Sequence, residues 1–286
     1  MIRDIVEDHE IEYAIVQPEL EVLEWARVQE RKELPCKVLL PEIGLAETLT
    51  DKAKTSAILE PYGLVPPSVS FGRDTIRIEE LEAALPYPFW VRGTSGSSGV
   101  GSLKVHSRDE LENWIHINDD VDQFIASAYL PGRNLACKLL YHEGTLLRSA
   151  CAERVNYVMS KVAPSGITGN TSFGRLLNDD HVTAIARQAL DRLFNATDSR
   201  AHGFFTADLK EDASGTPFIT EVNVRHVAFT GCMAAAGATF MEDTLRLLAN
   251  DSSLDRTYRP YQFAEGLVFL RDVDELPIVM KESDLL

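Results

Sequence analysis

The sequence predicts a mixed α/β (α+β) fold, and three patterns along the chain support this prediction. Strand and helix signals alternate near the N-terminus, two probable β-hairpins follow, and a long amphipathic helix lies between those hairpins. The chain has 286 residues, of which 45% are hydrophobic and 25% are charged. This composition is typical of a globular protein.

A short strand–helix–strand unit comes first. The segment Glu12–Pro18 has the pattern of a strand, Pro18–Lys32 that of an amphipathic helix, and Cys36–Pro41 that of a second, buried strand. This unit is too short to be a complete nucleotide-binding fold. We therefore expect residues 1–47 to form only a partial α/β segment ahead of the main domain.

Two helices are expected before the first hairpin. The segment Thr50–Gly63 has the pattern of a helix, with Thr50 or Asp51 as its N-cap and a glycine near its exit. Two consecutive prolines follow and favour an extended chain. A second helix is expected around Ile78–Ala84.

Glycine and serine dominate the loop of the first hairpin. Strands at Phe89–Arg92 and Ser102–His106 flank this loop, which reads GTSGSSGVG. Glycines let backbone N–H groups approach phosphate oxygens closely, serines add hydroxyl donors, and Arg92 offers a bidentate fork to phosphate. The phosphate motifs GxxxxGK[ST] and GxGxxG are absent, so we expect a lid that folds over a triphosphate. The alternative is a surface hairpin without a ligand.

The middle of the chain is expected to contain further strands, a loop and a helix. The strands are interrupted by Pro131-Gly132 and by the hairpin-like turn His142-Glu143-Gly144. The segment Ser160–Gly174 is polar and glycine-rich, which predicts a loop, and Asp179–Phe194 has the pattern of a helix. His202 comes just before a glycine and is expected to be a turn residue.

Acidic and basic side chains share one face of the second hairpin. In the strand FITEVNVRH, apolar residues alternate with Glu221, Asn223 and Arg225, so these three lie on one face. Asp208 lies on the first arm, and the pairing of the arms brings it close to Glu221. Two carboxylates and an amide oxygen suit Mg²⁺, and Arg225 is placed to neutralise a phosphoryl group. The alternative is the solvated polar face of an antiparallel sheet.

Charge and composition limit the partners that we expect. The net charge of −16, from 28 basic and 44 acidic residues, disfavours nucleic acid, which normally requires a basic field. The sequence has no run of about 18 apolar residues that predicts a membrane helix, and its start lacks the apolar region of a signal peptide. The four cysteines form no CxxC pair, so we expect reduced thiols in the cytoplasm.

Taken together, four segments resemble the ATP-grasp family, in the order that the family has them. Thr50–Pro67 resembles the helix that opens the lid, and Pro88–Leu111 resembles the phosphate-binding hairpin. Gln123–Gly144 resembles the hinge and ribose strand, and Gly203–Gly237 resembles the metal-binding hairpin with its following helix. The most similar subgroup is that of carbamoyl-phosphate synthase large chains and biotin carboxylase-like ligases.

The resemblance implies a division of the chain. Residues 48–250 would form the ATP-grasp domain, with a lid subdomain at about 52–125 and a metal-binding subdomain at about 126–250. Residues 251–286 would form a C-terminal segment. The N-terminal domain of the family is shortened here to its second half. Another chain, either a second copy or a partner subunit, is therefore an expected source of the missing substrate surface.

The resemblance also implies cofactors and site residues. ATP and Mg²⁺ are the implied cofactors, with Mn²⁺ as an alternative ion. The implied metal ligands are Asp208, Glu221 and Asn223, and the implied catalytic cations are Arg92 and Arg225. The residues implied to contact the nucleotide are Lys52, Arg92, Ser95, Gly96, Ser97, Ser98, Gly99, Ser127, Ala128, Leu130 and Asn134.

Three positions depart from the family pattern. Ser127 or Ala128 stands where the hinge usually carries a glutamate, and Asn134 replaces the acid that binds ribose. Both changes are expected to weaken nucleotide contacts. The usual Asn-Pro-Arg is here Asn223-Val224-Arg225, which keeps both functional side chains. Arg154 follows the hinge and is an expected clamp for a substrate carboxylate, and its alternative is a surface arginine in local ion pairs.

The function that the resemblance implies is that of an ATP-dependent ligase. Such an enzyme activates a carboxylate as an acyl-phosphate and joins it to an amine or a similar nucleophile, releasing ADP and phosphate. Its partners are small-molecule carboxylate and nucleophile substrates. Two alternatives stay open, namely a nucleotide-binding subunit without catalytic activity and an ATP-grasp kinase that stops at a phosphorylated product.

Overall fold

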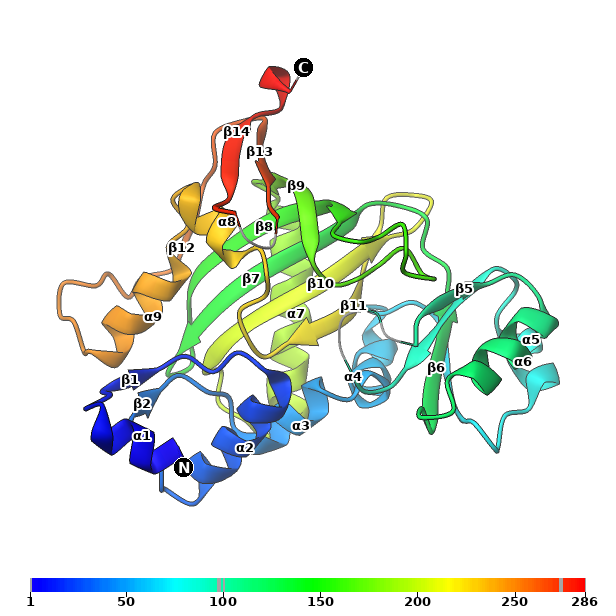
Figure 1. Cartoon of the computed structure of the whole chain (residues 1–286), viewed down its shortest axis with the longest axis horizontal. Coiled ribbons are helices and arrows are strands. Elements are labelled where there is room, and N and C mark those ends of the chain that lie inside the picture. The colour runs from blue at the N-terminus through cyan, green and yellow to red at the C-terminus, as the bar shows by residue number, and fades with distance from the viewer. Residues whose placement is uncertain (1, 97–98, 100, 273–274, 286) are drawn as a thin grey trace.

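An eight-stranded sheet forms the centre of the computed structural model, which describes residues 2–96, 99, 101–272 and 275–285 (Figure 1). The strand order is β11-β10-β7-β8-β9-β13-β14, all neighbours on this path are antiparallel, and β12 pairs with β8 in parallel. The strands are β7 (Asn134–His142), β8 (Thr145–Tyr157), β9 (Thr171–Leu177), β10 (Gly203–Glu211), β11 (Pro217–Asn223), β12 (Arg259–Pro260), β13 (Leu267–Leu270) and β14 (Ile278–Lys281).

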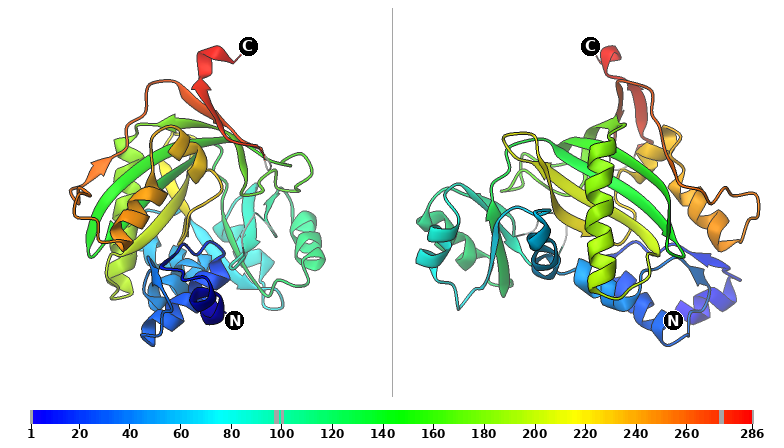
Figure 2. Two further views of the ribbon diagram at one scale, coloured as in Figure 1. Left: turned by 60° about the vertical axis from the view of Figure 1, so that its left-hand side comes forward. Right: turned by 180° about the vertical axis from the view of Figure 1, so that it is seen from behind.

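Helices cover both faces of this central sheet. The long helix α7 (Asp180–Ala196) crosses the back of the sheet (Figure 2), where its apolar stripe packs on Leu135, Cys137 and Leu139 of β7. The alternate residues of β7 point to the other face, where they meet α8 (Thr230–Ala235) and α9 (Phe240–Leu248). Apolar residues on both faces of β7 thus place this strand in the core of the molecule.

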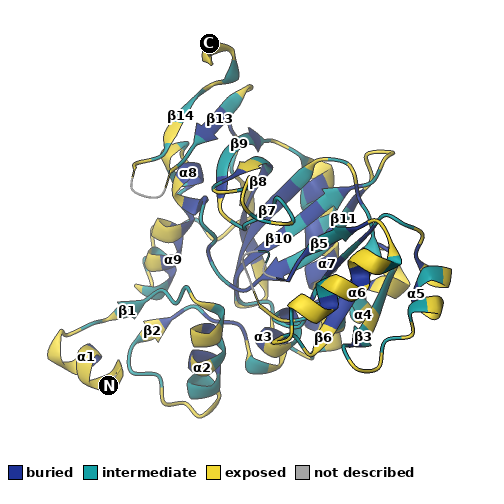
Figure 3. Cartoon of the chain, turned by 45° about the vertical axis from the view of Figure 1, so that its right-hand side comes forward, coloured by how far each residue is buried: buried dark blue, intermediate teal, exposed yellow. Residues whose placement is uncertain are grey.

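A smaller four-stranded sheet lies to one side. Its order is β3-β6-β4-β5, and all its neighbours are antiparallel. Helices α5 (Ile78–Ala84) and α6 (Arg108–Ile117) cover one of its faces, bury Leu81 and Leu111 against Phe89 and Phe124, and expose their outer sides (Figure 3). The strands are β3 (Ser68–Gly72), β4 (Phe89–Gly93), β5 (Leu103–Val105) and β6 (Gln123–Ala128).

The N-terminal segment packs beside one end of the central sheet (Figure 1). The predicted strand–helix–strand unit is confirmed, because β1 and β2 pair in parallel on either side of α2, although each strand has only two residues. The elements of this region are α1 (Ile2–Asp8), β1 (Tyr13–Ala14), α2 (Glu19–Glu30), β2 (Lys37–Val38), α3 (Ile43–Leu49), α4 (Lys52–Leu59) and the 3₁₀ helix η1 (Glu60–Tyr62). A second 3₁₀ helix, η2 (Glu282–Asp284), follows β14.

One predicted loop is partly a strand. The segment Ser160–Gly174 was expected to be a loop throughout, but β9 already begins at Thr171 and pairs with both β8 and β13. Glycine usually indicates a turn or a loop, but Gly174 lies within β9, where the absence of a side chain leaves room for Phe269. A Cβ atom at Gly174 would lie 2.5 Å from Cζ of Phe269 and 2.6 Å from the carbonyl oxygen of Glu153.

Two expectations about the whole chain can be compared with the structure. The four cysteines are free thiols, which agrees with the expectation of reduced cysteines. Among the described residues, none of the helices combines the length and the apolar character needed to cross a bilayer.

Candidate active site

A cavity of about 210 Å³ is lined by residues from both of the larger sheets. Every described residue that the sequence assigned to the nucleotide, metal or substrate site lies at its wall. Of the predicted residues, only Ser97 and Ser98 lie outside the described part of the chain. The predicted residues at the wall are Lys52, Arg92, Ser95, Gly96, Gly99, Ser127, Ala128, Leu130, Asn134, Arg154, Asp208, Glu221, Asn223 and Arg225.

The hairpin of β10 and β11 brings the acidic groups together. Asp208 pairs in register with Glu221, and Thr206 pairs with Asn223, so the three predicted metal ligands share one face. The Asn223 side chain donates a hydrogen bond from Nδ2 to Oδ2 of Asp208, at 3.2 Å. Burial, together with the charge of Glu221, raises the pKa of Asp208, and the nearby cation Arg154 opposes this shift. Three hard oxygen donors therefore lie side by side in a poorly solvated place.

Arg154 is buried, so the alternative of a surface arginine is wrong. Its residue is only 9% exposed, and its Nη1 lies 3.0 Å from Oδ1 of Asp208. The remaining donors are also used, since Nε donates to Thr171 Oγ1 at 2.9 Å and Nη2 donates to the Gly169 carbonyl at 2.7 Å. Buried charges are found in proteins when they are paired in this way. Arg154 thus fixes the position of the Asp208 carboxylate.

Lys52 connects the glycine loop to the acidic hairpin. Asp51 caps α4 by accepting two backbone N–H groups of the first turn, which confirms the predicted cap and fixes Lys52 at the start of the helix. The Lys52 ammonium donates to the Gly96 carbonyl at 2.6 Å and lies 3.2 Å from Oε1 of Glu221. One cation therefore contacts both hairpins on which the prediction depended.

Arg92 reaches from β4 to the acidic hairpin. Its Nη2 donates to the Thr220 carbonyl, while its buried Nε has no hydrogen-bond partner among the described residues. Burial lowers the pKa of the guanidinium, and the negative charges of Glu221 and Asp208 oppose the shift. A buried N–H group without a partner is costly, so this arginine is suited to receive an anionic ligand in the cavity.

The sequence analysis missed Glu19, which comes from the N-terminal segment. Glu19 Oε1 lies 3.3 Å from Nη2 of Arg225, and both side chains are about one-fifth exposed. Burial raises the pKa of Glu19, and the charge of Arg225 opposes this change. No sequence signal marks this acid, because a glutamate at the start of a helix is ordinary. The contact depends on packing between segments that are 206 positions apart.

Two lysines in the strands were also missed. Lys138 on β7 is fully buried, donates to Thr230 Oγ1 at 2.9 Å and lies 4.2 Å from the centroid of the Phe229 ring. Burial lowers its pKa to about 7. Lys210 lines the cavity and donates to Oδ1 of Asn134 at 3.1 Å. Lys138 did carry a signal, because it interrupts the otherwise apolar run LACKLL.

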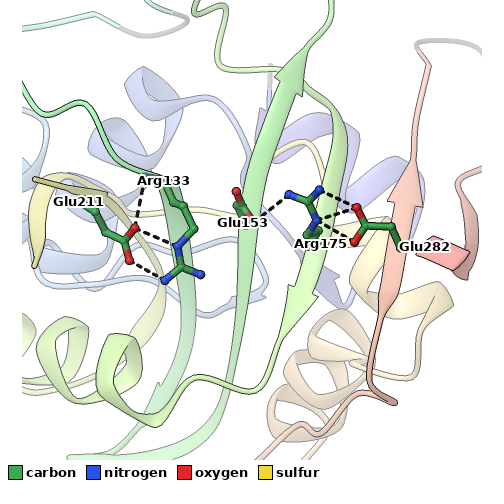
Figure 4. A network of polar contacts seen from close by, with 5 residues as sticks. All are labelled: Arg133, Glu153, Arg175, Glu211 and Glu282. Atoms are coloured by element: carbon green, nitrogen blue, oxygen red, sulfur yellow. Dashed lines mark hydrogen bonds and ion pairs between the residues drawn. The ribbon is translucent and has the colours of Figure 1, made fainter. Parts of the chain in front are cut away.

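Ion pairs fix the connection between β6 and β7, which carries the predicted hinge. Arg133 is bidentate to Glu211 at the end of β10, as Figure 4 shows, and the Gly132 N–H donates to the Glu211 carbonyl at 2.8 Å. The same figure shows Arg175 of β9 between Glu153 of β8 and Glu282 of η2, which ties the C-terminal 3₁₀ helix to the central sheet. The hinge is therefore anchored to the hairpin that carries the acidic residues.

No family model matches the sequence, and no curated protein matches it either. Solved structures do match. The D-alanine–D-alanine ligase from Bacillus anthracis has a TM-score of 0.63 and 15% identity, over 88% of this chain and 86% of that chain. The biotin carboxylase domain of the Hydrogenobacter thermophilus 2-oxoglutarate carboxylase, which was solved with MgADP, ADP and bicarbonate, has a TM-score of 0.70 and 15% identity. The L-amino acid ligase from Bacillus licheniformis has a TM-score of 0.65 and 18% identity.

These similarities define the fold. The chain has the ATP-grasp fold, as the resemblance of its four segments implied. The coverage differs between the neighbours. The match to the biotin carboxylase domain covers 94% of this chain and 60% of the other, and the match to the L-amino acid ligase covers 94% and 64%. This chain therefore spans less than two thirds of the length of these two neighbours.

Proposed function

We propose that this protein is a cytoplasmic ATP-dependent ligase. It activates a small-molecule carboxylate as an acyl-phosphate and joins it to an amine or a similar nucleophile, with release of ADP and phosphate. In this proposal residues 48–250 form the catalytic domain, and residues 1–47 contribute Glu19 to its edge. The solved neighbours support the reaction class, since their names include a D-alanine–D-alanine ligase and an L-amino acid ligase.

One observation carries the proposal. The acids Asp208 and Glu221 line the same cavity as the cations Lys52, Arg92 and Arg225. Phosphoryl transfer needs little covalent help from a protein, but it needs charge neutralisation and positioning. A cavity with a carboxylate cluster for a divalent ion and several cations for phosphate groups provides both requirements.

The donor set fits Mg²⁺. Asp208, Glu221 and Asn223 offer hard oxygen atoms from two neighbouring strands, and Mg²⁺ usually takes a few such ligands together with phosphate oxygens and water. Mn²⁺ accepts the same donors. When bound, the ion would supply neutralisation of the triphosphate charge. The orphaned Nε of Arg92 is a donor available to a phosphate oxygen of ATP.

The other residues of the cavity wall position the nucleotide in this proposal. Ser95, Gly96 and Gly99 cover the phosphates, and Lys52 contacts them from the start of α4. The backbone of residues 127–130, with Ser127, Ala128 and Leu130, holds the adenine, and Asn134 is at the ribose. Lys210 donates to Asn134, so the ribose end of the cavity carries a cation.

The reaction then has two steps. A carboxylate oxygen of the substrate attacks the γ-phosphorus, the bond to ADP breaks, and Arg92 and Arg225 stabilise the charge on the transferred group. The lone pair of the nucleophile attacks the acyl carbon, and the bond from this carbon to the phosphate oxygen breaks with its electron pair on inorganic phosphate. The proton that an amine nucleophile loses passes to the departing phosphate or to solvent. Arg154 uses its donors on Asp208, Thr171 and the Gly169 carbonyl, so it orients the Asp208 carboxylate. In this proposal the substrate carboxylate binds Arg225, which exchanges its contact with Glu19 for it.

The experiment that tests the proposal is a screen for ADP release. The protein is incubated with Mg²⁺-ATP and pairs of amino acids, peptides and small carboxylates. A ligase releases ADP only when both substrates are present and yields a product with a new bond. A phosphorylated carboxylate as final product supports the kinase instead. Nucleotide binding without release under any pair supports the non-catalytic subunit.

A variant tests the metal assignment directly. Glu221→Gln keeps the size of the side chain and removes its charge, so we expect ADP formation to fall by about 10²–10³-fold or more. The control is Glu242→Gln, because Glu242 is exposed on α9 and does not line the cavity. Full turnover by the Glu221 variant would remove this acid from the mechanism.

A further inference from the structure

A group of side chains that could hold a metal ion lies at the end of β7 that is far from the cavity. Asn134 begins this strand at the cavity wall, and His142 ends it, roughly 26 Å away at the rise of a β-strand. His142, Glu143 and His202 each offer one ligand atom, and these three atoms lie within 4.8 Å of one another. None of them lines the cavity of the proposed ligase site.

The backbone holds this group in place. Glu143 and Gly144 have φ angles of 50° and 87°, as the two central residues of a tight hairpin turn require. The Gly144 N–H donates to the Ala201 carbonyl at 2.8 Å, and the Glu143 N–H donates to Nδ1 of His202 at 3.2 Å. The turn between β7 and β8 is thereby fixed against the segment that enters β10, 59 positions away in the sequence.

Both imidazole rings are partly buried. Burial is the main cause that lowers the pKa of His202, to about 4, and burial also lowers the pKa of His142. His202 Nδ1 and Glu143 Oε1 lie 3.1 Å apart.

The distance between these two atoms suits a shared ion. Two ligand atoms of a tetrahedral Zn²⁺ with bonds of about 2.0–2.1 Å lie about 3.3 Å apart. Metal binding at Nδ1 of His202 replaces only the hydrogen bond from the Glu143 N–H, which is at the long end of the normal range. Arg200 pairs with the other carboxylate oxygen of Glu143, which leaves Oε1 free to face the ring. An outer partner of this kind orients a ligating carboxylate.

We propose that His142, Glu143 and His202 bind one Zn²⁺ ion, with water completing its coordination. Two imidazole nitrogens and one carboxylate oxygen suit a borderline ion such as Zn²⁺, whereas Mg²⁺ prefers oxygen donors only. The ion joins the β7–β8 turn to the segment before β10. That segment also holds the N-terminal part of the chain, because the Arg200 N–H donates to Oε1 of Glu42 at 3.2 Å. The site is therefore a structural clamp and is separate from the proposed catalysis.

Zinc titration of the full chain tests this proposal. Protein treated with a chelator is titrated with ZnCl₂ in excess Mg²⁺, which competes for the acidic hairpin, and the zinc content is measured after gel filtration. We expect one Zn²⁺ per chain. His142→Ala and Glu143→Gln should each weaken binding by at least about 10-fold to 100-fold, the loss known for mere supporting residues. The control is His116→Ala, which removes an exposed histidine of α6.

Three outcomes would overturn the assignment. The first is that the chelated protein takes up no Zn²⁺, and the second is that binding survives unchanged in both variants. The third is that Glu221→Gln removes the zinc and the two variants do not, because the ion would then lie in the cavity. Glu143 is 47% exposed, so Glu143→Gln should keep the fold, and circular dichroism checks this. Nucleotide binding measured on the same samples separates this result from the fate of the ligase proposal.

Discussion

A fully buried lysine lies close behind the acidic hairpin. Moving an ammonium group out of water costs free energy. A hydrogen bond to the Thr230 hydroxyl and a cation–π contact with the Phe229 ring offset part of this cost for Lys138. The charge of Asp208 favours the protonated form of the lysine, and burial opposes it more strongly. Lys138 in turn favours the ionised form of Asp208. Its charge therefore supports the proposed metal ligand while reducing the stability of the fold.

Replacing this lysine should change how stability depends on pH. The pKa of Lys138 falls from 10.5 to about 7 on folding, so between these values the unfolded chain binds more protons. Stability therefore rises with pH over that window, by up to about 1.4 kcal/mol per pH unit from this group. Lys138→Met should remove that part of the slope, as measured by urea unfolding at several pH values from neutral upward.

The control for this experiment is the replacement of a lysine whose side chain is exposed to solvent in the folded protein. Lys54→Met is suitable, because the side chain of Lys54 is 62% exposed on α4. The slope of stability against pH should then match that of the wild type. Parallel curves for the wild type and the Lys138 variant would mean that this ammonium keeps its ordinary pKa in the folded protein.

At the scale of elements, the hinge connection depends on one close approach. Gly132 donates its N–H to the Glu211 carbonyl, and a Cβ atom at this position would lie 2.6 Å from Cβ of Glu211 and 2.8 Å from its carbonyl oxygen. Only glycine permits this contact without a shift of the backbone. The connection also carries Arg133, whose bidentate pair with Glu211 is partly exposed. The close backbone contact is therefore the stronger constraint on the hinge.

Gly132→Ala should separate the hinge from β10. We expect the free energy of unfolding to fall by about 1–3 kcal/mol, the usual cost of overpacking, and the KM for ATP to rise if residues 127–130 hold the adenine. The matched control is Gly44→Ala in α3, where a Cβ atom meets nothing within 4 Å and alanine favours the helix. Equal stability of the two variants would contradict this account.

Local patterns explain which parts of the fold and site were predictable. Alternation along FITEVNVRH places Glu221 and Asn223 on one face, and the pairing of hairpin arms adds Asp208. The signals for α4, α5 and the strands around the glycine loop are also local, and these elements form where expected. In each case the information lies within about twenty residues of sequence.

The unpredicted parts depend on contacts between distant segments. Glu19 reaches Arg225 only because the N-terminal segment packs beside the central sheet. The short strands β12, β13 and β14 have no strong alternation of their own, and β13 forms because β9 offers it an edge. Periodicity shows which face of a strand is apolar, but it does not show which segment will cover that face.

At the scale of the whole molecule, the cavity draws its wall from two sheets and several loops. Arg92 belongs to the smaller sheet, Asp208 and Glu221 belong to the central sheet, and Lys52 contacts both sides. A ligand that binds here must therefore stabilise the contact between the two parts of the chain. Binding should be visible in global unfolding as well as in local changes.

Mg²⁺-ATP should raise the melting temperature. A ligand at 100 times its Kd stabilises the folded state by about 2.7 kcal/mol, which corresponds to a rise of about 4–5 °C for a chain of 286 residues. Differential scanning fluorimetry measures this shift. The Glu221→Gln variant should lose the part of the rise in melting temperature that depends on Mg²⁺. An unchanged melting temperature at every ATP concentration would contradict nucleotide binding.

The ion pairs made by three cations of the cavity wall have a consequence for selectivity. Lys52 is paired with Glu221, Arg154 with Asp208, and Arg225 with Glu19. An incoming molecule must displace such contacts before it forms its own, so association is an exchange of partners. A weakly charged compound forms weaker electrostatic contacts with these cations than their present carboxylate partners do. We therefore expect neutral analogues to bind more weakly than charged ligands because of these ion pairs, even where their shape fits the cavity.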